Sequence, residues 1–297
     1  MVESRISRLA ATESSGGIGS LSITMALFTG LLPELDGFEI YARRGRLAHD
    51  LNEAQRLGKP AWSVHGRTGI PDDWNPLQED TLLWVINRMT PQTEYLINSY
   101  GNQVDVLVHA PEFIRNPQLY QTVGLLQFQN GIRRLWIENH PGKKGVNDAV
   151  QVVRKLRSPQ IPVDAGMMYD LFHALKNTYG DQQAFRNSWK HVLAEIGQIS
   201  KTQKIPLGLH IPIGTKKSDS LPVEWMDRSM WQDLAFQVFD LDIQRIVFEH
   251  QFAELNTLAV PFPRQVNEAN RRLLELADQQ LVPAGILTGT IESQVQE

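Results

Sequence analysis

The sequence of 297 residues contains no cysteine. Disulfides, thiolate nucleophiles, iron–sulfur clusters and cysteine-ligated zinc sites are therefore excluded. Neither sign of charge is in large excess, because the formal net charge is −4. This balance gives no overall attraction to nucleic acid or to anionic membranes, so neither is an expected partner. No apolar run reaches membrane-spanning length and residues 1–20 carry no signal-peptide pattern, so a cytoplasmic protein is expected.

Short apolar runs rich in β-branched residues recur along the chain, with polar stretches between them. Eight of these runs are expected to be strands, at residues 21–28, 37–42, 61–65, 104–109, 134–138, 161–164, 207–210 and 245–249. Because they are apolar on both faces, they are typical of parallel strands that are covered on both sides. The spacing of apolar residues predicts helices over 147–156, 184–199, 230–239 and 267–276.

Strands that alternate with helices form βαβ units, and eight such units predict an α/β protein with a single (β/α)₈ barrel. No linker and no internal repeat indicates a second domain. The sequence therefore predicts a flexible N-terminal segment over residues 1–20 and one barrel over residues 21–297.

Six of the eight predicted strands end in a side chain that can bind a metal. These residues are His65, His109, Glu138, Asp164, His210 and Glu249. In a parallel barrel the C-terminal ends of the strands meet at one mouth, so six imidazoles and carboxylates would converge there. Three converging carboxylates favour a bound cation, because buried charges need a partner or a metal. Singly, each has an ordinary alternative: a core histidine is commonly only hydrogen-bonded, and Asp164 could cap a helix.

The pattern resembles the xylose isomerase-like barrel superfamily, which contains sugar isomerases and epimerases and the metal-dependent apurinic endonucleases. The segments GFEI (37–40), WIEN (136–139), VD (163–164), LH (209–210) and VFE (247–249) look like its second, fifth, sixth, seventh and eighth strands. The resemblance implies that one metal ion is held by Glu138, Asp164, His210 and Glu249. It also implies that His65 and His109 stand where the endonuclease branch places histidines for additional zinc ions.

Two features depart from the superfamily's pattern. Its sixth strand commonly reads Asp-x-x-His, whereas Met167 follows Asp164 at that spacing, and a thioether does not replace an imidazole for a hard or borderline ion. The endonuclease branch has an Asp-x-His pair after the seventh strand, which the segment GTKKSDSLP (214–222) lacks. These departures favour a single metal over a trinuclear zinc site. The remaining histidines, His173 among them, are expected at the surface or behind the ligands.

Three carboxylates and one imidazole favour Mn²⁺, Mg²⁺, Co²⁺ or Fe²⁺, and Zn²⁺ becomes the alternative if His65 and His109 also bind. Basic residues, Arg43 and Lys216 among them, follow several predicted strands and favour a small anionic substrate. The resulting hypothesis is a metal-dependent isomerase or epimerase of a sugar phosphate or sugar acid. Glu138 and Glu249 would exchange the proton beside the carbonyl, through an enediolate that the cation stabilises.

Two hypotheses from other classes stay open. A metallo-phosphodiesterase that acts on nucleic acid would use at least two ions, with His65 and His109 as further ligands. A barrel that binds a ligand or partner without turnover would hold metal weakly or not at all, or would hold metal without chemistry. Trp74 and Trp225 follow predicted strands, where each could stack on a sugar ring or a base, or fill a helix–loop junction. The oligomeric state is left open by the sequence.

Overall fold

The computed structural model describes residues 7–12, 37–41, 56, 61–65, 104–115, 117–121, 132–141, 143–161, 163–178, 180–214, 221–222, 225–241 and 243–249. Its strands are β1 (Ser7–Thr12), β2 (Gly37–Tyr41), β3 (Ala61–His65), β4 (Val104–His109), β5 (Ile132–Glu138), β6 (Ala165–Asp170), β7 (Leu207–Gly214), β8 (Leu221–Pro222) and β9 (Arg245–Glu249). Its helices are α4 (Ala110–Arg115), α6 (Lys143–Leu156), α7 (Leu171–Leu175), η1 (Lys176–Thr178), α8 (Gln182–Gly197), η2 (Gln198–Thr202) and α9 (Arg228–Asp240).

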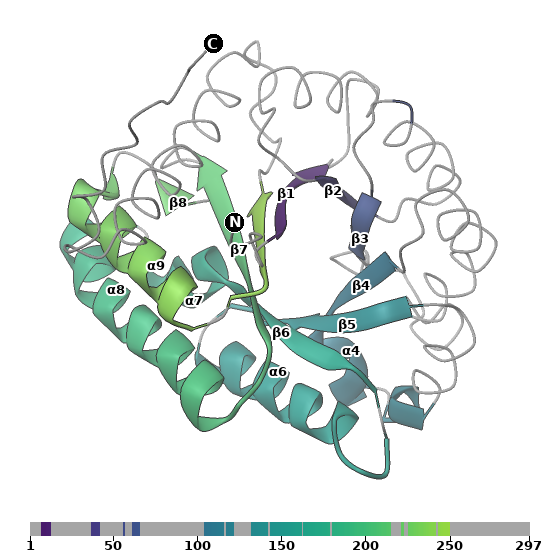
Figure 1. Cartoon of the computed structure of the whole chain (residues 1–297). Coiled ribbons are helices and arrows are strands. Elements are labelled where there is room, and N and C mark those ends of the chain that lie inside the picture. The colour runs from purple at the N-terminus through teal and green to yellow at the C-terminus, as the bar shows by residue number, and fades with distance from the viewer. Residues whose placement is uncertain are drawn as a thin grey trace, which may run out of the picture.

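Eight parallel strands form a closed ring. The strands β1 to β7 pair in chain order, and β9 closes the ring by pairing with both β7 and β1. The two-residue strand β8 pairs only with β7 and adds nothing to the ring. Figure 1 looks along the barrel and shows helices α6, α8 and α9 outside the ring. The predicted (β/α)₈ barrel is confirmed.

Two of the predicted strands have no counterpart among the described strands. The strand predicted at residues 21–28 lies outside the described residues, whereas Ser7–Thr12 form β1 inside the segment predicted to be flexible. The sixth strand is not residues 161–164 but Ala165–Asp170, so this prediction was wrong. The other predicted strands agree with β2, β3, β4, β5, β7 and β9 to within a few residues. Of the predicted helices, residues 267–276 lie outside the described residues.

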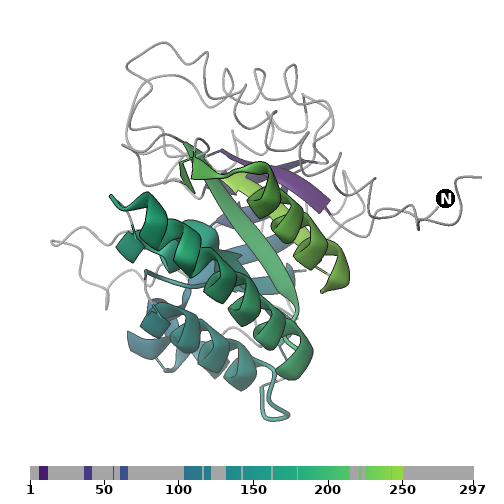
Figure 2. The ribbon, with the colours of Figure 1, turned by 90° about the vertical axis from the view of Figure 1, so that its left-hand side faces the viewer.

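Amphipathic helices cover the outside of the ring because their apolar stripes match the outward side chains of the strands. Helix α8 begins at the cap residue Asp181, whose carboxylate accepts from the backbone N–H groups of Gln183 and Ala184. Its buried stripe includes Phe185 and Trp189. Figure 2 shows α8 and α9 lying side by side on this face of the barrel, where the two helices contact each other. This layer forms the larger apolar core.

A smaller apolar layer fills the inside of the barrel. Its members Leu107, Trp136, Met168 and Val247 come from β4, β5, β6 and β9, and all are buried. The indole of Trp136 needs the space beside Gly166, since a Cβ on this glycine would lie 2.6 Å from the ring. This layer separates two polar groups of side chains at the two ends of the strands.

The group at the N-terminal ends of the strands is centred on Asp105 of β4. Its carboxylate accepts from Arg133 at 2.8 and 2.9 Å and from the indole N–H of Trp136 at 2.7 Å, and it lies 2.8 Å from Arg245. Arg245 and Asp105 are almost fully buried. A buried ion pair therefore lies at this end of the barrel, and a separate polar cluster lies at the other.

None of the helices in the described ranges combines the length and the apolar composition needed to cross a membrane.

Candidate metal centre

The C-terminal ends of the strands bring seven metal-capable side chains together. They are Glu39 of β2, His65 of β3, His109 of β4, Glu138 of β5, Asp170 of β6, His210 of β7 and His173 of α7. Four of them, on β3 to β6, are the last residues of their strands. Since parallel strands end at one edge, residues far apart in the sequence meet in one small volume.

Glu138 lies at the centre of this cluster and is 1% exposed. Its Oε2 atom lies 3.2 Å from His65 Nε2 and 3.0 Å from His109 Nε2. Its Oε1 atom lies 3.2 Å from His210 Nδ1 and 3.8 Å from His173 Nδ1. One buried carboxylate thus faces four imidazoles, which makes it the common partner of the whole cluster.

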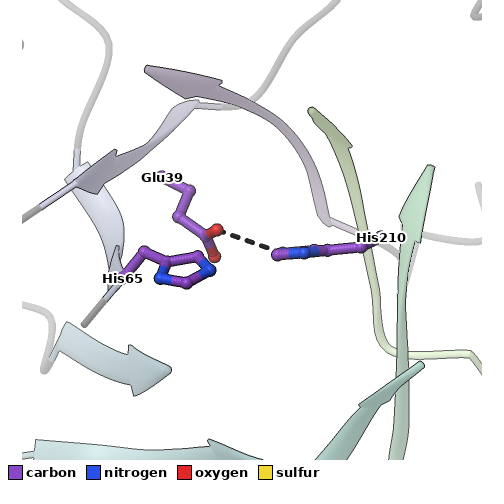
Figure 3. Close-up of side chains that lie close together, drawn as sticks. All are labelled: Glu39, His65 and His210. Atoms are coloured by element: carbon purple, nitrogen blue, oxygen red, sulfur yellow. Dashed lines mark hydrogen bonds and ion pairs between the residues drawn. The ribbon is translucent and has the colours of Figure 1, made fainter. Parts of the chain in front are cut away.

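His210 stands between two carboxylates. Its Nδ1 atom faces Glu138, while its Nε2 atom lies 3.0 Å from Oε1 of Glu39. Figure 3 shows Glu39, His65 and His210 pointing toward one another inside the barrel from β2, β3 and β7. A carboxylate that binds one ring nitrogen of a histidine orients the other nitrogen toward a metal. Glu39 is therefore placed to orient His210.

Asp170 links the sixth strand to the helix that follows it. It is the last residue of β6 and the cap of α7, and its Oδ1 accepts from the backbone N–H of His173 at 2.7 Å. Its Oδ2 lies 3.9 Å from His173 Nδ1. In the β6–β7 ladder Asp170 is in register with His210. Asp170 therefore combines a capping role with a place in the cluster.

Burial and charge act against each other at these groups. Burial disfavours the ionised carboxyl of Glu138, but His109 and His210 outweigh it and hold its pKa well below the usual value. Burial also opposes protonation of His65, yet the hydrogen bond and charge of Glu138 raise its pKa. For His173 burial is again outweighed, mainly by Asp170 and Glu138, and its pKa is raised. The carboxylates and the imidazoles of the cluster therefore stabilise each other's charged forms.

The donor set fits a divalent cation. Three groups of side chains offer ligand atoms within 4.8 Å of one another: Glu39 with His65 and His210; His65 with His109 and Glu138; and Glu138 with Asp170 and His210. Carboxylate oxygens and imidazole nitrogens are ligands of Mn²⁺, Fe²⁺, Co²⁺ and Zn²⁺. A cation would also balance the charge of the buried carboxylates, so the residues present suit a metal.

Asp164, predicted as a ligand, does not lie in the cluster. It precedes β6 at the N-terminal end of the barrel, its side chain is 47% exposed, and it pairs with Arg134 at 3.0 Å. The residue in the expected place is Asp170, at the other end of the same strand. The prediction failed because the run 161–164 was taken for the strand that residues 165–170 form.

The same shift removes one predicted departure from the superfamily's pattern. Met167 lies inside β6, so its spacing from Asp164 has no bearing on the site. The segment Asp170–Leu171–Phe172–His173 has the Asp-x-x-His spacing, and His173 lies in the cluster. His173 was expected at the surface or behind the ligands, and Glu39 was not among the predicted ligands. The Asp-x-x-His spacing after an apolar run was the sequence signal that could have identified Asp170 and His173.

The other predicted site residues divide into three cases. In the first case, four residues lie together in the cluster: His65, His109, Glu138 and His210. Glu249 is the last residue of β9, but its side chain lies outside the described residues, as do Arg43 and Lys216. Trp225 is buried and its ring lies edge-on to Phe185 of α8, 5.6 Å away, so it fills a junction between elements. Trp74 lies outside the described residues.

Comparison with known proteins gives matches among solved structures. No family model and no curated protein matches the sequence. A D-tagatose 3-epimerase-like protein matches with a TM-score of 0.58 and 12% identity, over 93% of this chain and 100% of that one. The match supports a (β/α)₈ barrel fold, in agreement with the closed ring of parallel strands.

Two further structures support this fold. A xylose isomerase domain containing protein from Salmonella typhimurium has a TM-score of 0.50 and 13% identity, over 94% of this chain and 100% of that one. The IOLI protein with a bound zinc atom has a TM-score of 0.50 and 11% identity, over 92% and 99%. At these identities the similarity shows the fold alone, so the function is argued from the site.

Proposed function

We propose that this protein is a metal-dependent isomerase or epimerase of a small anionic sugar, a sugar phosphate or a sugar acid. The observation that carries the proposal is that Glu138, Asp170 and His210 offer ligand atoms within 4.8 Å of one another at the buried C-terminal ends of the strands. Active sites of such barrels are built at this end. The names of structural neighbours, which include a D-tagatose 3-epimerase-like protein, are consistent with this chemistry.

The proposed ligands are Glu138, Asp170 and His210, with Glu249 as the fourth. Asp170 takes the place that the sequence had given to Asp164. Three carboxylates and one imidazole favour Mn²⁺, Mg²⁺, Co²⁺ or Fe²⁺, whereas participation of His65 and His109 would favour Zn²⁺. When bound, the cation would supply Lewis-acid stabilisation of negative charge on the substrate oxygens.

The proton transfers are assigned to carboxylates of this chain. The neighbouring imidazoles keep Glu138 ionised against the effect of burial, and an ionised carboxylate accepts a proton. We assign to Glu138 the removal of the proton from the carbon beside the carbonyl, and to Glu249 its return. His65 and His109 would contact substrate hydroxyls, and Arg43 and Lys216 would bind the anionic group.

The test is hydrogen exchange at the substrate carbon. The protein, loaded in turn with Mn²⁺, Co²⁺, Mg²⁺ and Zn²⁺, is incubated in D₂O with ketoses, sugar phosphates and sugar acids, and deuterium beside the carbonyl is followed by NMR after the metal is removed. Exchange that is lost in Glu138→Gln and retained in Asp164→Asn is expected. No exchange with any substrate by a protein that binds the metal would refute the proposal.

A second candidate, a metallo-phosphodiesterase, is favoured by one observation. His65, His109 and Glu138 form a second group of ligand atoms beside the first, and Asp170 and His173 supply a pair whose absence had spoken against this function. Two ions could then share Glu138, and a pair of metal ions stabilises both the attacking and the leaving oxygen in phosphodiester hydrolysis. Two or more zinc ions per chain, with cleavage of abasic DNA, would favour it over the isomerase.

A further inference from the structure

Asn139 follows the central carboxylate and is fully buried, but it offers no charge and is no part of the ligand groups. Both ends of its side-chain amide are engaged with the backbone of Asp170. Oδ1 accepts from Asp170 N–H at 2.8 Å and Nδ2 donates to Asp170 C=O at 3.2 Å. The β5–β6 ladder has its last pair at Glu138 and Met168. The amide therefore adds one further pair of hydrogen bonds beyond the end of the ladder.

The main chain of Asn139 holds a second member of the cluster. Its carbonyl oxygen lies 2.7 Å from Nδ1 of His173. A carbonyl only accepts, so in the neutral imidazole the hydrogen is on Nδ1 and the lone pair is on Nε2. The tautomer that can bind a metal through Nε2 is thereby selected.

The segment between β5 and α6, which contains Asn139, is closely packed against α6. A Cβ on Gly145 would lie 1.8 Å from the carbonyl oxygen of His140, so the first turn of α6 contacts this backbone directly. The imidazole of His140 lies 3.2 Å from Asp148 in the same helix. The backbone next to Asn139 is therefore held from the outer side, while its side chain reaches the neighbouring strand.

We propose that Asn139 is a positioning residue of the metal centre, which fixes Asp170 through its amide and His173 through its carbonyl relative to Glu138. This inference rests on the metal site of the proposed function. The role needs a donor and an acceptor on one short side chain. Alanine supplies neither, and aspartate supplies only the acceptor.

The experiment is a titration of the metal-free full chain with Co²⁺, whose visible absorption spectrum reports the geometry of its ligands. Affinity comes from competition with a chelator, and far-UV circular dichroism with thermal unfolding reports the fold. The variants are Asn139→Ala and the isosteric Asn139→Asp. The matched control is Tyr169→Phe, next to Asp170 in the sequence but outside the cluster. It removes a partly buried hydrogen bond of 2.6 Å to Glu195 of α8.

We expect Asn139→Ala to bind Co²⁺ about 10- to 100-fold more weakly, with a changed spectrum, as for other residues that support metal ligands. Tyr169→Phe should lower the unfolding temperature and leave both metal readouts unchanged. A folded Asn139→Ala that behaves like Tyr169→Phe would overturn the positioning role. If the alanine variant does not fold, an unchanged spectrum in Asn139→Asp overturns it equally. Failure of the unaltered chain to bind Co²⁺ would instead refute the metal site itself.

Discussion

Asp164 precedes β6 and Asp170 is its last residue, and the same substitution at the two positions gives opposite predictions. Asp170→Asn removes a carboxylate from the cluster, whereas Asp164→Asn removes one from the N-terminal end of the barrel. Asparagine also caps helices, so the substitution at Asp170 should leave α7 in place. The comparison therefore changes charge at two positions while the fold is kept.

The magnitude follows from distance. The ligand atoms of Asp170, Glu138 and His210 lie within 4.8 Å of one another. A unit charge about 4 Å away contributes about 4 kcal/mol at an effective dielectric constant of about 20, which corresponds to nearly three powers of ten in affinity. Because an amide and water replace part of this interaction, we expect a loss of about 100- to 1,000-fold for Asp170→Asn. Asp164 lies a strand length away, about 20 Å, where salt screens its charge, so a change under about twofold is expected.

The assay is chelator competition with Co²⁺ or Mn²⁺ on the unaltered chain and both variants, with the metal content of each purified protein determined by mass spectrometry. A large loss confined to Asp170→Asn supports the cluster as the metal centre. Loss of metal in Asp164→Asn with retention in Asp170→Asn would refute the reasoning, because it would place the site at the opposite end of the barrel.

Three further predictions concern the pH dependence of metal binding, the orientation of His210 and the ion pair at the N-terminal end of the barrel. Burial lowers the pKa of His65 and His173, but the nearby carboxylates outweigh it and raise the pKa of both above the usual 6.5. Protons should therefore compete with the metal, and metal affinity should rise as the pH is raised above 6.5. A metal affinity that calorimetry finds independent of pH would contradict this. Glu39→Gln should weaken Co²⁺ binding about 10- to 100-fold, and unchanged chelator competition would exclude an orienting role. Asp105→Asn should lower the free energy of unfolding, measured with urea, by about 3–5 kcal/mol, because the buried Arg245 loses the charge of Asp105. Metal affinity should stay unchanged. A loss of metal affinity in this variant would contradict the separation of the two ends of the barrel.

The sequence by itself determined the barrel and most of the site. Short apolar runs followed by a polar residue identified His65, His109, Glu138 and His210. The first three end their strands, where polar atoms become tolerable, whereas His210 lies within β7. These four residues meet in the structure as predicted, although their roles as ligands stay a prediction.

Only the tertiary structure decided which residues form the sixth strand, and therefore that Asp170 and not Asp164 lies in the cluster. The runs 161–164 and 165–170 are both apolar, and the true strand contains Gly166, Met167 and Met168, which have little intrinsic preference for strands. In the closed barrel the indole of Trp136 lies against Gly166 of this strand, where a Cβ would not fit. That contact joins residues thirty positions apart, and a local pattern carries no information about packing over such a separation.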